Sequence, residues 1–134
     1  MGPLVHYELT LQWAQEAGLA DVAEQIARAD VLVDREFRAT TSLKNLTMHF
    51  APWSYFWVWR YRRQAVREDS AVALGRALHC AQDSVAHGVL GLAHLRFDAG
   101  LGRNPDDWRA APERIRERIY ERSMDLLHAF RKRG

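Results

Sequence analysis

Apolar residues recur through most of this chain every three to four positions, which is the spacing of amphipathic helices. No stretch alternates apolar and polar residues for long enough to predict a strand. Pro3 suits a first helical turn, Gly18 a helix end and Ser70 a helix cap. The pattern therefore predicts an all-α fold, a compact bundle of about five helices, with long helices over residues 3–16, 20–37, 70–87 and 112–132 and a short helix after the polar linker 39–45.

The predicted helix 70–87 carries His79, Asp83 and His87 at positions i, i+4 and i+8. Each step of four residues turns by only about 40° around the helix axis, so the three side chains share one stripe. The surrounding residues are mostly apolar and indicate a buried helix, in which such groups are costly without partners. A metal ion would remove that cost, and the stripe therefore predicts a metal site. Hydrogen bonding of each residue by itself is the alternative.

Two earlier helices bring further polar groups to apolar faces. His6 shares the apolar side of the first helix, and Asp30 lies within the apolar side of the second. Asp34 follows Asp30 by one helical turn, at the edge of the same side. A metal site and a salt bridge to one of the many arginines explain these carboxylates equally well.

Other candidate ligands stand outside these helices. His49 precedes a proline by three residues, which places it near a helix end or in an ordered loop. His94 and Asp98 form a second His/acid pair at i and i+4, close in sequence to the first pair. His128, in the last helix, has no acidic partner at ligand spacing, so we expect it to be structural or exposed.

The collected donors are nitrogen and oxygen atoms, which suit Zn²⁺ in a hydrolytic site and also admit Mn²⁺ or Fe²⁺. Eight groups exceed what one tetrahedral ion needs, so we expect two or three ions. The candidate ligands are His6, Asp30 or Asp34, His49, His79, Asp83, His87, His94 and Asp98.

A dense block of aromatic residues and arginines covers residues 53–63. Such a block most often belongs to a hydrophobic core, with the arginines stacked on the outer rings. A substrate wall, a base-stacking platform and a membrane-facing patch are the other interpretations. A net charge of +2 and a pI near 9.0 are too weak to predict nucleic-acid binding, so arginine runs are interpreted as solvated helix faces.

The 134 residues predict one domain, residues 1–134, that is large enough to fold around its own core. A single cysteine, Cys80, excludes an internal disulfide and fits a reducing compartment. No secretory signal and no apolar run of membrane-spanning length is present. We therefore expect a cytoplasmic protein, with its oligomeric state left open.

The order and spacing of these ligands resemble those of the zinc-dependent phospholipase C and single-strand nuclease superfamily, which consists of all-α enzymes with a trinuclear zinc cluster. The segment 78–87 also looks like the smaller bacterial proteins of that superfamily. The resemblance spans residues 6 to about 107 and is carried by His6, Asp34, the His49-Phe50 pair, the segment from Leu78 through Asp83 to His87, and the His94/Asp98 pair.

The resemblance implies a distribution of ligands over three ions. The first ion would take Asp34, His49, His79 and Asp83, the second His87, His94 and Asp98, and the third His6 and a bridging Asp83. In that family the third ion is completed by an N-terminal tryptophan, which this sequence lacks. The chain is also about half the usual length, has no disulfides, and carries Asp98 where the phospholipases have glutamate.

These residues predict a zinc-dependent hydrolase that uses metal-activated water on a phosphoester or a related small-molecule substrate. Asp34 and Asp83 are the expected catalytic residues, with a free oxygen of Asp30 or Asp34 as proton acceptor. Two other hypotheses stay open. One is a Lewis-acid cyclase, isomerase or dehydratase of a biosynthetic pathway; the other is a metal-stabilised binding protein without turnover.

Overall fold

In a computed structural model, the chain folds into a helical bundle with no strand among the described residues, which are 2–39, 41–88 and 92–133. The side chains of His94 and Leu95 also lie outside the described set. The all-α prediction is confirmed. Among the described residues the elements are a π-helical segment, η1 (Leu4–Leu9), and seven α-helices: α1 (Thr10–Glu16), α2 (Ala23–Glu36), α3 (Leu43–His49), α4 (Trp53–Glu68), α5 (Ala71–His87), α6 (Leu92–Asp98) and α7 (Glu113–Arg131).

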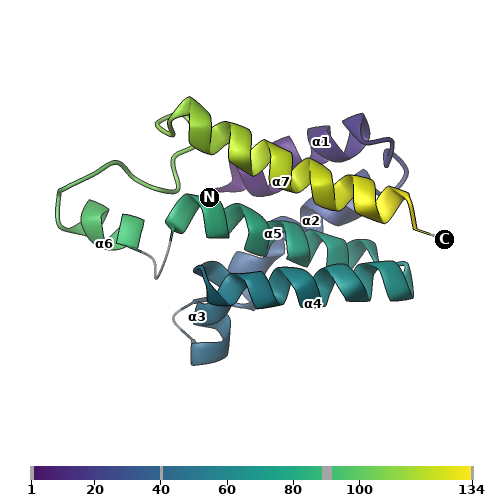
Figure 1. The fold of residues 1–134 in the computed structure, drawn as a ribbon, viewed down its shortest axis with the longest axis horizontal. Coiled ribbons are helices and arrows are strands. Elements are labelled where there is room, and N and C mark those ends of the chain that lie inside the picture. The colour runs from purple at the N-terminus through teal and green to yellow at the C-terminus, as the bar shows by residue number, and fades with distance from the viewer. Residues whose placement is uncertain (1, 40, 89–91, 134) are drawn as a thin grey trace.

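Helix α5 is the central element of the bundle, and it packs against α2, α4 and α7 (Figure 1). Its first turn is capped by Ser70, whose hydroxyl accepts a hydrogen bond from the Ala73 backbone N–H. It ends at Gly88, which has a positive φ of 71°. Nearly every side chain between these ends is buried, so α5 displays its polar stripe to neighbouring helices instead of solvent.

The crossing of α2 over α5 depends on Gly75. A Cβ atom at this position would lie 2.5 Å from the Ile26 carbonyl oxygen and 2.6 Å from the Ala29 Cβ. Only glycine permits this approach, because such contacts are far inside normal packing distances. The close crossing brings Asp30 and Asp34 of α2 against His79 of α5.

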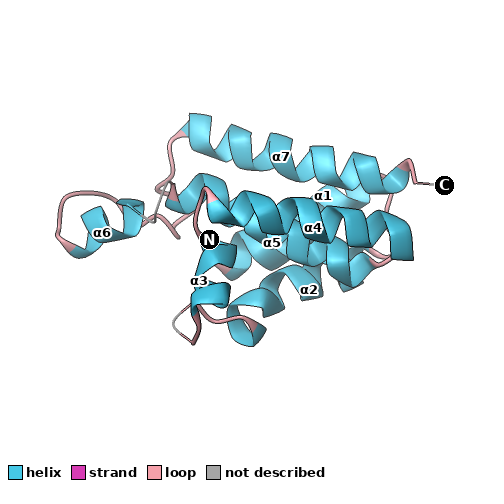
Figure 2. Cartoon of the chain, turned by 60° about the horizontal axis from the view of Figure 1, so that its bottom comes forward, coloured by secondary structure: helices cyan, strands magenta, loops and turns pink. Residues whose placement is uncertain are grey.

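The short helices α3 and α6 lie at one end of the bundle (Figure 2). Ser42 caps α3 by accepting a hydrogen bond from the Asn45 N–H, and the helix ends at His49. Helix α6 projects beyond this end of the bundle (Figure 2), and the loop that follows it returns to α5 before α7 begins. Helices of seven residues, such as α3 and α6, explain why the bundle has more elements than the five that the pattern predicts.

The aromatic block departs from its predicted burial because α4 packs on the bundle by only one face. Tyr61 is buried, but four rings are 46 to 52 % exposed: Trp53, Tyr55, Phe56 and Trp59. The prediction that such rings lie in the core is therefore wrong for these four. The predicted stacking is present, since the guanidinium of Arg63 lies 5.0 Å from the Trp59 ring centroid.

Candidate metal centre

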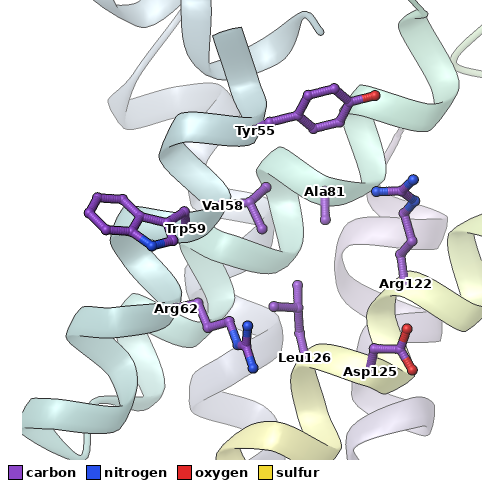
Figure 3. Close-up of a pocket in the computed structure, with 8 residues that line it drawn as sticks. All are labelled: Tyr55, Val58, Trp59, Arg62, Ala81, Arg122, Asp125 and Leu126. Atoms are coloured by element: carbon purple, nitrogen blue, oxygen red, sulfur yellow. The ribbon is translucent and has the colours of Figure 1, made fainter. Parts of the chain in front are cut away.

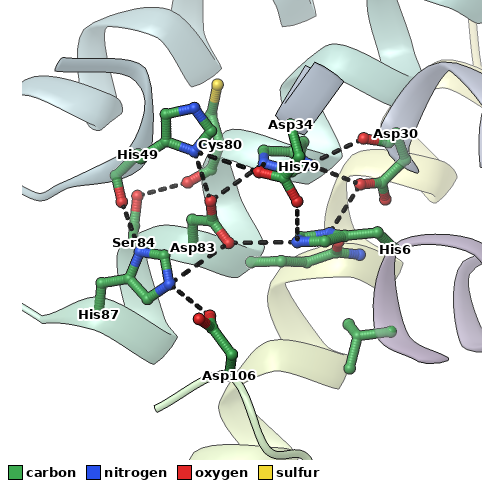
Figure 4. A network of polar contacts seen from close by, with 12 residues as sticks. His6, Asp30, Asp34, His49, His79, Cys80, Asp83, Ser84, His87 and Asp106 are labelled. Atoms are coloured by element: carbon green, nitrogen blue, oxygen red, sulfur yellow. Dashed lines mark hydrogen bonds and ion pairs between the residues drawn. The ribbon is translucent and has the colours of Figure 1, made fainter. Parts of the chain in front are cut away.

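A cluster of histidines and aspartates lies where η1, α2 and α3 meet α5 (Figure 4). The His79 side chain and the Asp30 side chain are completely buried, and Asp83 is 1 % exposed. Asp34 is the exception, with 52 % of its side chain exposed. The structure thus brings together these predicted ligands: His6, Asp30, Asp34, His49, His79, Asp83 and His87.

Four of these residues offer atoms that could hold one metal ion: Asp34, His49, His79 and Asp83. Asp83 Oδ2 lies 2.8 Å from His49 Nδ1 and 3.0 Å from His79 Nε2. Asp34 Oδ1 lies 3.7 Å and 3.2 Å from the same two nitrogens. The edges of a tetrahedral zinc site are about 3.3 Å long, since each donor is about 2.0 Å from the ion. The donor set and its spacing therefore fit a metal such as zinc.

A hydrogen bond to the backbone of α2 fixes the orientation of the His79 ring. Its Nδ1 is 2.8 Å from the backbone carbonyl oxygen of Asp30, which only accepts hydrogen bonds, so Nδ1 donates. In the neutral ring Nε2 then carries the lone pair, and this atom faces the carboxylates of Asp34 and Asp83. Among the described residues, His79 Nε2 has no hydrogen-bond partner. A ring nitrogen that faces two carboxylates needs positive charge beside it, supplied either by a metal ion or by a proton on the ring.

His6 is held in the same way by Gln82. The Gln82 amide nitrogen donates to the hydroxyls of Thr10 at 2.9 Å and Ser123 at 3.2 Å. Its carbonyl oxygen is therefore left to accept from His6 Nδ1 at 2.8 Å. His6 Nε2 then presents a lone pair 3.2 Å from Asp83 Oδ1, the oxygen that points away from His79.

His49 and His87 repeat this arrangement. His49 donates through Nε2 to the Phe37 carbonyl at 2.8 Å, which turns its Nδ1 toward Asp83. His87 donates through Nδ1 to the His49 carbonyl at 3.1 Å, which turns its Nε2 toward Asp106, 2.8 Å away. All four imidazoles thus direct a lone pair at a carboxylate, as metal ligands with outer partners do.

The electrostatics of the cluster follow from these contacts. Burial lowers the pKa of His79, but the charge of Asp83 and a hydrogen bond to Asp30 raise it well above its ordinary value of 6.5. Burial raises the pKa of Asp83, but neighbouring histidines lower it well below 3.8 overall. Burial likewise raises the pKa of Asp34, and its close polar contact with His79 lowers it overall below 3.8. Without a metal, protons on the histidines supply the positive charge that the carboxylates require.

Asp30 and Asp34 occupy different sides of the imidazoles. Asp30 Oδ1 lies 2.9 Å from His6 Nδ1 and 3.3 Å from His79 Nδ1, and its other oxygen accepts from the Thr10 hydroxyl at 2.9 Å. Asp30, His6 and His79 also lie close enough to hold an ion. However, both Nδ1 atoms already donate hydrogen bonds there, so we assign Asp30 to positioning and Asp34 to ligation.

The second predicted pair lies elsewhere. Asp98 is exposed at the end of α6 and belongs to neither group of candidate ligands, while the side chain of His94 lies outside the described residues. Asp106 from the returning loop lies against His87 instead. Sequence reasoning missed Asp106, which has no helical spacing to reveal it. It also missed Gln82, whose position three residues after His79 on a buried helix was a usable signal.

Comparisons of this chain with protein-family models, with curated proteins and with solved structures found no match. The likeness to the phospholipase C and nuclease superfamily stays a prediction carried by the motif residues. The chemistry of the cluster is therefore inferred from the geometry of its own donors.

Proposed function

We propose that this protein is a metal-dependent hydrolase that acts on a phosphoester or a related small molecule, with zinc as its metal. One observation carries the proposal: one nitrogen of each of four imidazoles converges on a cluster of carboxylates, and one of these carboxylates, Asp34, is exposed to solvent. The nitrogen and oxygen donors favour zinc over metals that require thiolates or oxygen-only shells.

The two oxygens of Asp83 support a centre of two ions. Oδ2 faces His49 and His79, whereas Oδ1 faces His6 at 3.2 Å and His87 at 3.9 Å. One ion would be held by the first group of four ligands, and a second by His6, His87, Asp83 and the newly found ligand Asp106.

The charges of the cluster agree with two divalent ions. Asp30, Asp34, Asp83 and Asp106 provide four negative charges, and neutral imidazoles add none. Two divalent cations would balance this total, whereas a cluster with fewer cations needs protonated histidines.

Metal ions in such a centre supply Lewis-acid chemistry, because they lower the pKa of a water molecule and stabilise charge on a phosphoryl group. The chain's own residues supply position and proton transfer. The outer hydrogen bonds of His6 and His79 fix their rings, and burial keeps bulk water from that side. Asp34, half exposed, is placed to accept a proton from water at the open side.

The exposure of Asp34 favours catalysis over a purely structural role. A catalytic metal site must be accessible to water and to substrate. Here one ligand is 52 % exposed while the other three of the first group are buried. A substrate can therefore approach from the side of Asp34.

The proposal is tested by metal analysis and by hydrolysis of bis(p-nitrophenyl) phosphate on the purified protein. We expect about two metal equivalents per chain and metal-dependent turnover. His79→Ala should lose bound metal and activity, whereas His128→Ala should retain both, because His128 is exposed and lies outside the cluster.

Full activity in chelated protein would overturn the proposal. Metal binding without hydrolysis of any phosphate mono- or diester would remove the hydrolase but keep the metal centre. In that case a Lewis-acid role on another substrate class becomes the function to test.

A further inference from the structure

The outer face of α4 divides into an aromatic half and a basic half. The aromatic half consists of Trp53, Tyr55, Phe56 and Trp59, each 46 to 52 % exposed. The basic half consists of Arg60, Arg62, Arg63 and Arg67, all exposed. Glu68 is the only acidic residue of the helix, so this α4 surface carries a clear excess of positive charge.

Two hollows border Trp59 on this surface. One, of about 370 Å³, lies between α4 and α7, where Arg62 and Arg122 lie on opposite sides of the apolar Val58 and Leu126 and Asp125 also lines the hollow (Figure 3). The other, of about 540 Å³, is lined by Arg60, Arg63 and Arg67. Each hollow therefore offers guanidinium groups beside an exposed indole, at a size suited to a phosphate-bearing headgroup.

Three aromatic rings of α4 have an arginine guanidinium group within about 6 Å of the ring centroid. Arg63 lies 5.0 Å from the Trp59 centroid, Arg60 lies 5.9 Å from Trp57, and Arg122 lies 5.9 Å from Tyr55. Base stacking needs an open ring face. This pairing instead matches the headgroup region of a membrane, where aromatic rings and basic side chains lie side by side.

We propose that the α4 surface docks this protein on bilayers that contain anionic lipids, with the aromatic half in the headgroup region and the arginines on lipid phosphates. The attachment is peripheral, because no helix among the described residues has the length and hydropathy to cross a membrane. Charge complementarity selects the partner, since four arginines face outward on this one helix.

Vesicle co-sedimentation tests this proposal, using phosphatidylcholine vesicles with and without phosphatidylglycerol. The wild-type protein should bind only the anionic vesicles, and added salt should weaken binding. Arg60→Gln with Arg63→Gln should weaken binding about tenfold or more. The matched control is Arg114→Gln with Arg118→Gln, which removes the same charge from exposed positions of α7 and should leave binding within about twofold.

The contribution of the rings is tested separately. Trp53→Ser with Phe56→Ser should weaken vesicle binding about tenfold, because the rings no longer reach the interface. The control, Leu92→Ser with Leu101→Ser, removes two apolar side chains that are at least as exposed and lie in other segments. Thermal melts by circular dichroism verify that each variant folds.

Three results would overturn the proposal. The first is that the wild-type protein does not bind anionic vesicles. The second is that the variants and their controls lose vesicle binding equally. The third is that the wild-type protein binds a single-stranded oligonucleotide but no vesicles, and that the α4 variants lose this oligonucleotide binding. The last result would assign the surface to nucleic acid. None of these readouts requires metal or activity, so the outcome is independent of the proposed hydrolase.

Discussion

The centre of the molecule and the outer face of α4 depart from the usual distribution of side chains in opposite directions. Around Asp83 the protein buries charged and polar groups, with His79 and Asp30 completely inaccessible. On α4 it exposes large rings such as Trp59. Most of the remaining core is apolar, formed by residues such as Leu78, Ile119 and Leu127.

The buried polar cluster and the exposed rings of α4 differ in what stabilises them. The buried cluster has an outer hydrogen bond for each imidazole and turns the other nitrogen of each ring toward a carboxylate, so it indicates a cation-binding site inside the protein. The exposed rings of α4 are about half uncovered, and two of them, Trp59 and Tyr55, have an arginine over the ring, so this surface indicates a partner outside the protein. Places where a sequence violates the apolar-in, polar-out pattern are thus the best guide to its function.

The largest expected effect comes from removing metal, which should destabilise the protein through the buried cluster. A metal at a thousandfold excess over its Kd adds about 4 kcal/mol to the free energy of unfolding. Chelation should therefore lower the Tm strongly, and added zinc should restore it, as followed by circular dichroism. If neither chelation nor added zinc changes the Tm, the buried charges are balanced without a metal ion, and the cluster is not a metal site.

The next effect tests how the cluster is assembled. Gly75→Ala should cost about 1 to 3 kcal/mol, because its Cβ would clash with backbone and side-chain atoms of α2. Metal affinity should fall with it, since Asp34 moves away from His79. Gly102→Ala is the matched control, because its Cβ would meet only Arg96 Cβ at an ordinary 3.8 Å. Equal unfolding free energies for both variants in denaturant melts would contradict this packing.

A smaller effect separates positioning from ligation. Asp30→Asn keeps the backbone carbonyl that holds His79 but removes the carboxylate near His6. Metal affinity should fall about 10- to 100-fold while the metal count stays the same. Competition titrations with a chromophoric chelator measure the affinity. Complete loss of one metal equivalent would make Asp30 a ligand instead.

The stability of the fold should change more gradually with pH, and in opposite directions in the metal-free and metal-loaded protein. The pKa of His79 is raised in the metal-free fold, so its stabilisation is present below 6.5 and is lost as pH rises through the higher folded value. Metal competes with protons for the same nitrogens, so the protein should bind metal more tightly, and the metal-loaded form should become more stable, as pH rises. Thermal melts between neutral and alkaline pH should thus diverge, and parallel curves would contradict the cluster's assignment.

The smallest expected effect concerns the exposed rings. Trp53→Ser should change the free energy of unfolding by no more than about 0.5 kcal/mol, because the ring is 46 % exposed and lies on the outer face of α4. Denaturant melts give the value directly. A large loss of stability would mean that the aromatic half stabilises the fold, and it would contradict the interpretation of these rings as a surface for an outside partner.

The sequence predicted the helical class because apolar spacing and capping residues act locally. Ser70 begins α5 as predicted, and His79 and Asp83 share one face because helix geometry alone places them together. The burial of His6 followed from the same periodicity. These features depend on spacing within one helix, which a sequence displays directly.

The missed features depend on tertiary structure. Asp106 reaches His87 only because the chain leaves α5 for α6 and returns through a loop. The choice between Asp30 and Asp34 depends on how α2 crosses α5, which Gly75 controls through contacts that no periodicity encodes. The exposure of Trp59 likewise depends on α4 having neighbours on only one side.

The central claim is that Asp83 is shared by two ions in the buried cluster. A crystal structure of protein grown with zinc, with anomalous data collected at the zinc edge, tests it most directly. The account predicts two peaks beside Asp83, one among Asp34, His49 and His79 and one toward His6 and His87. A single anomalous peak in the cluster, or no peak beside Asp83, would contradict it.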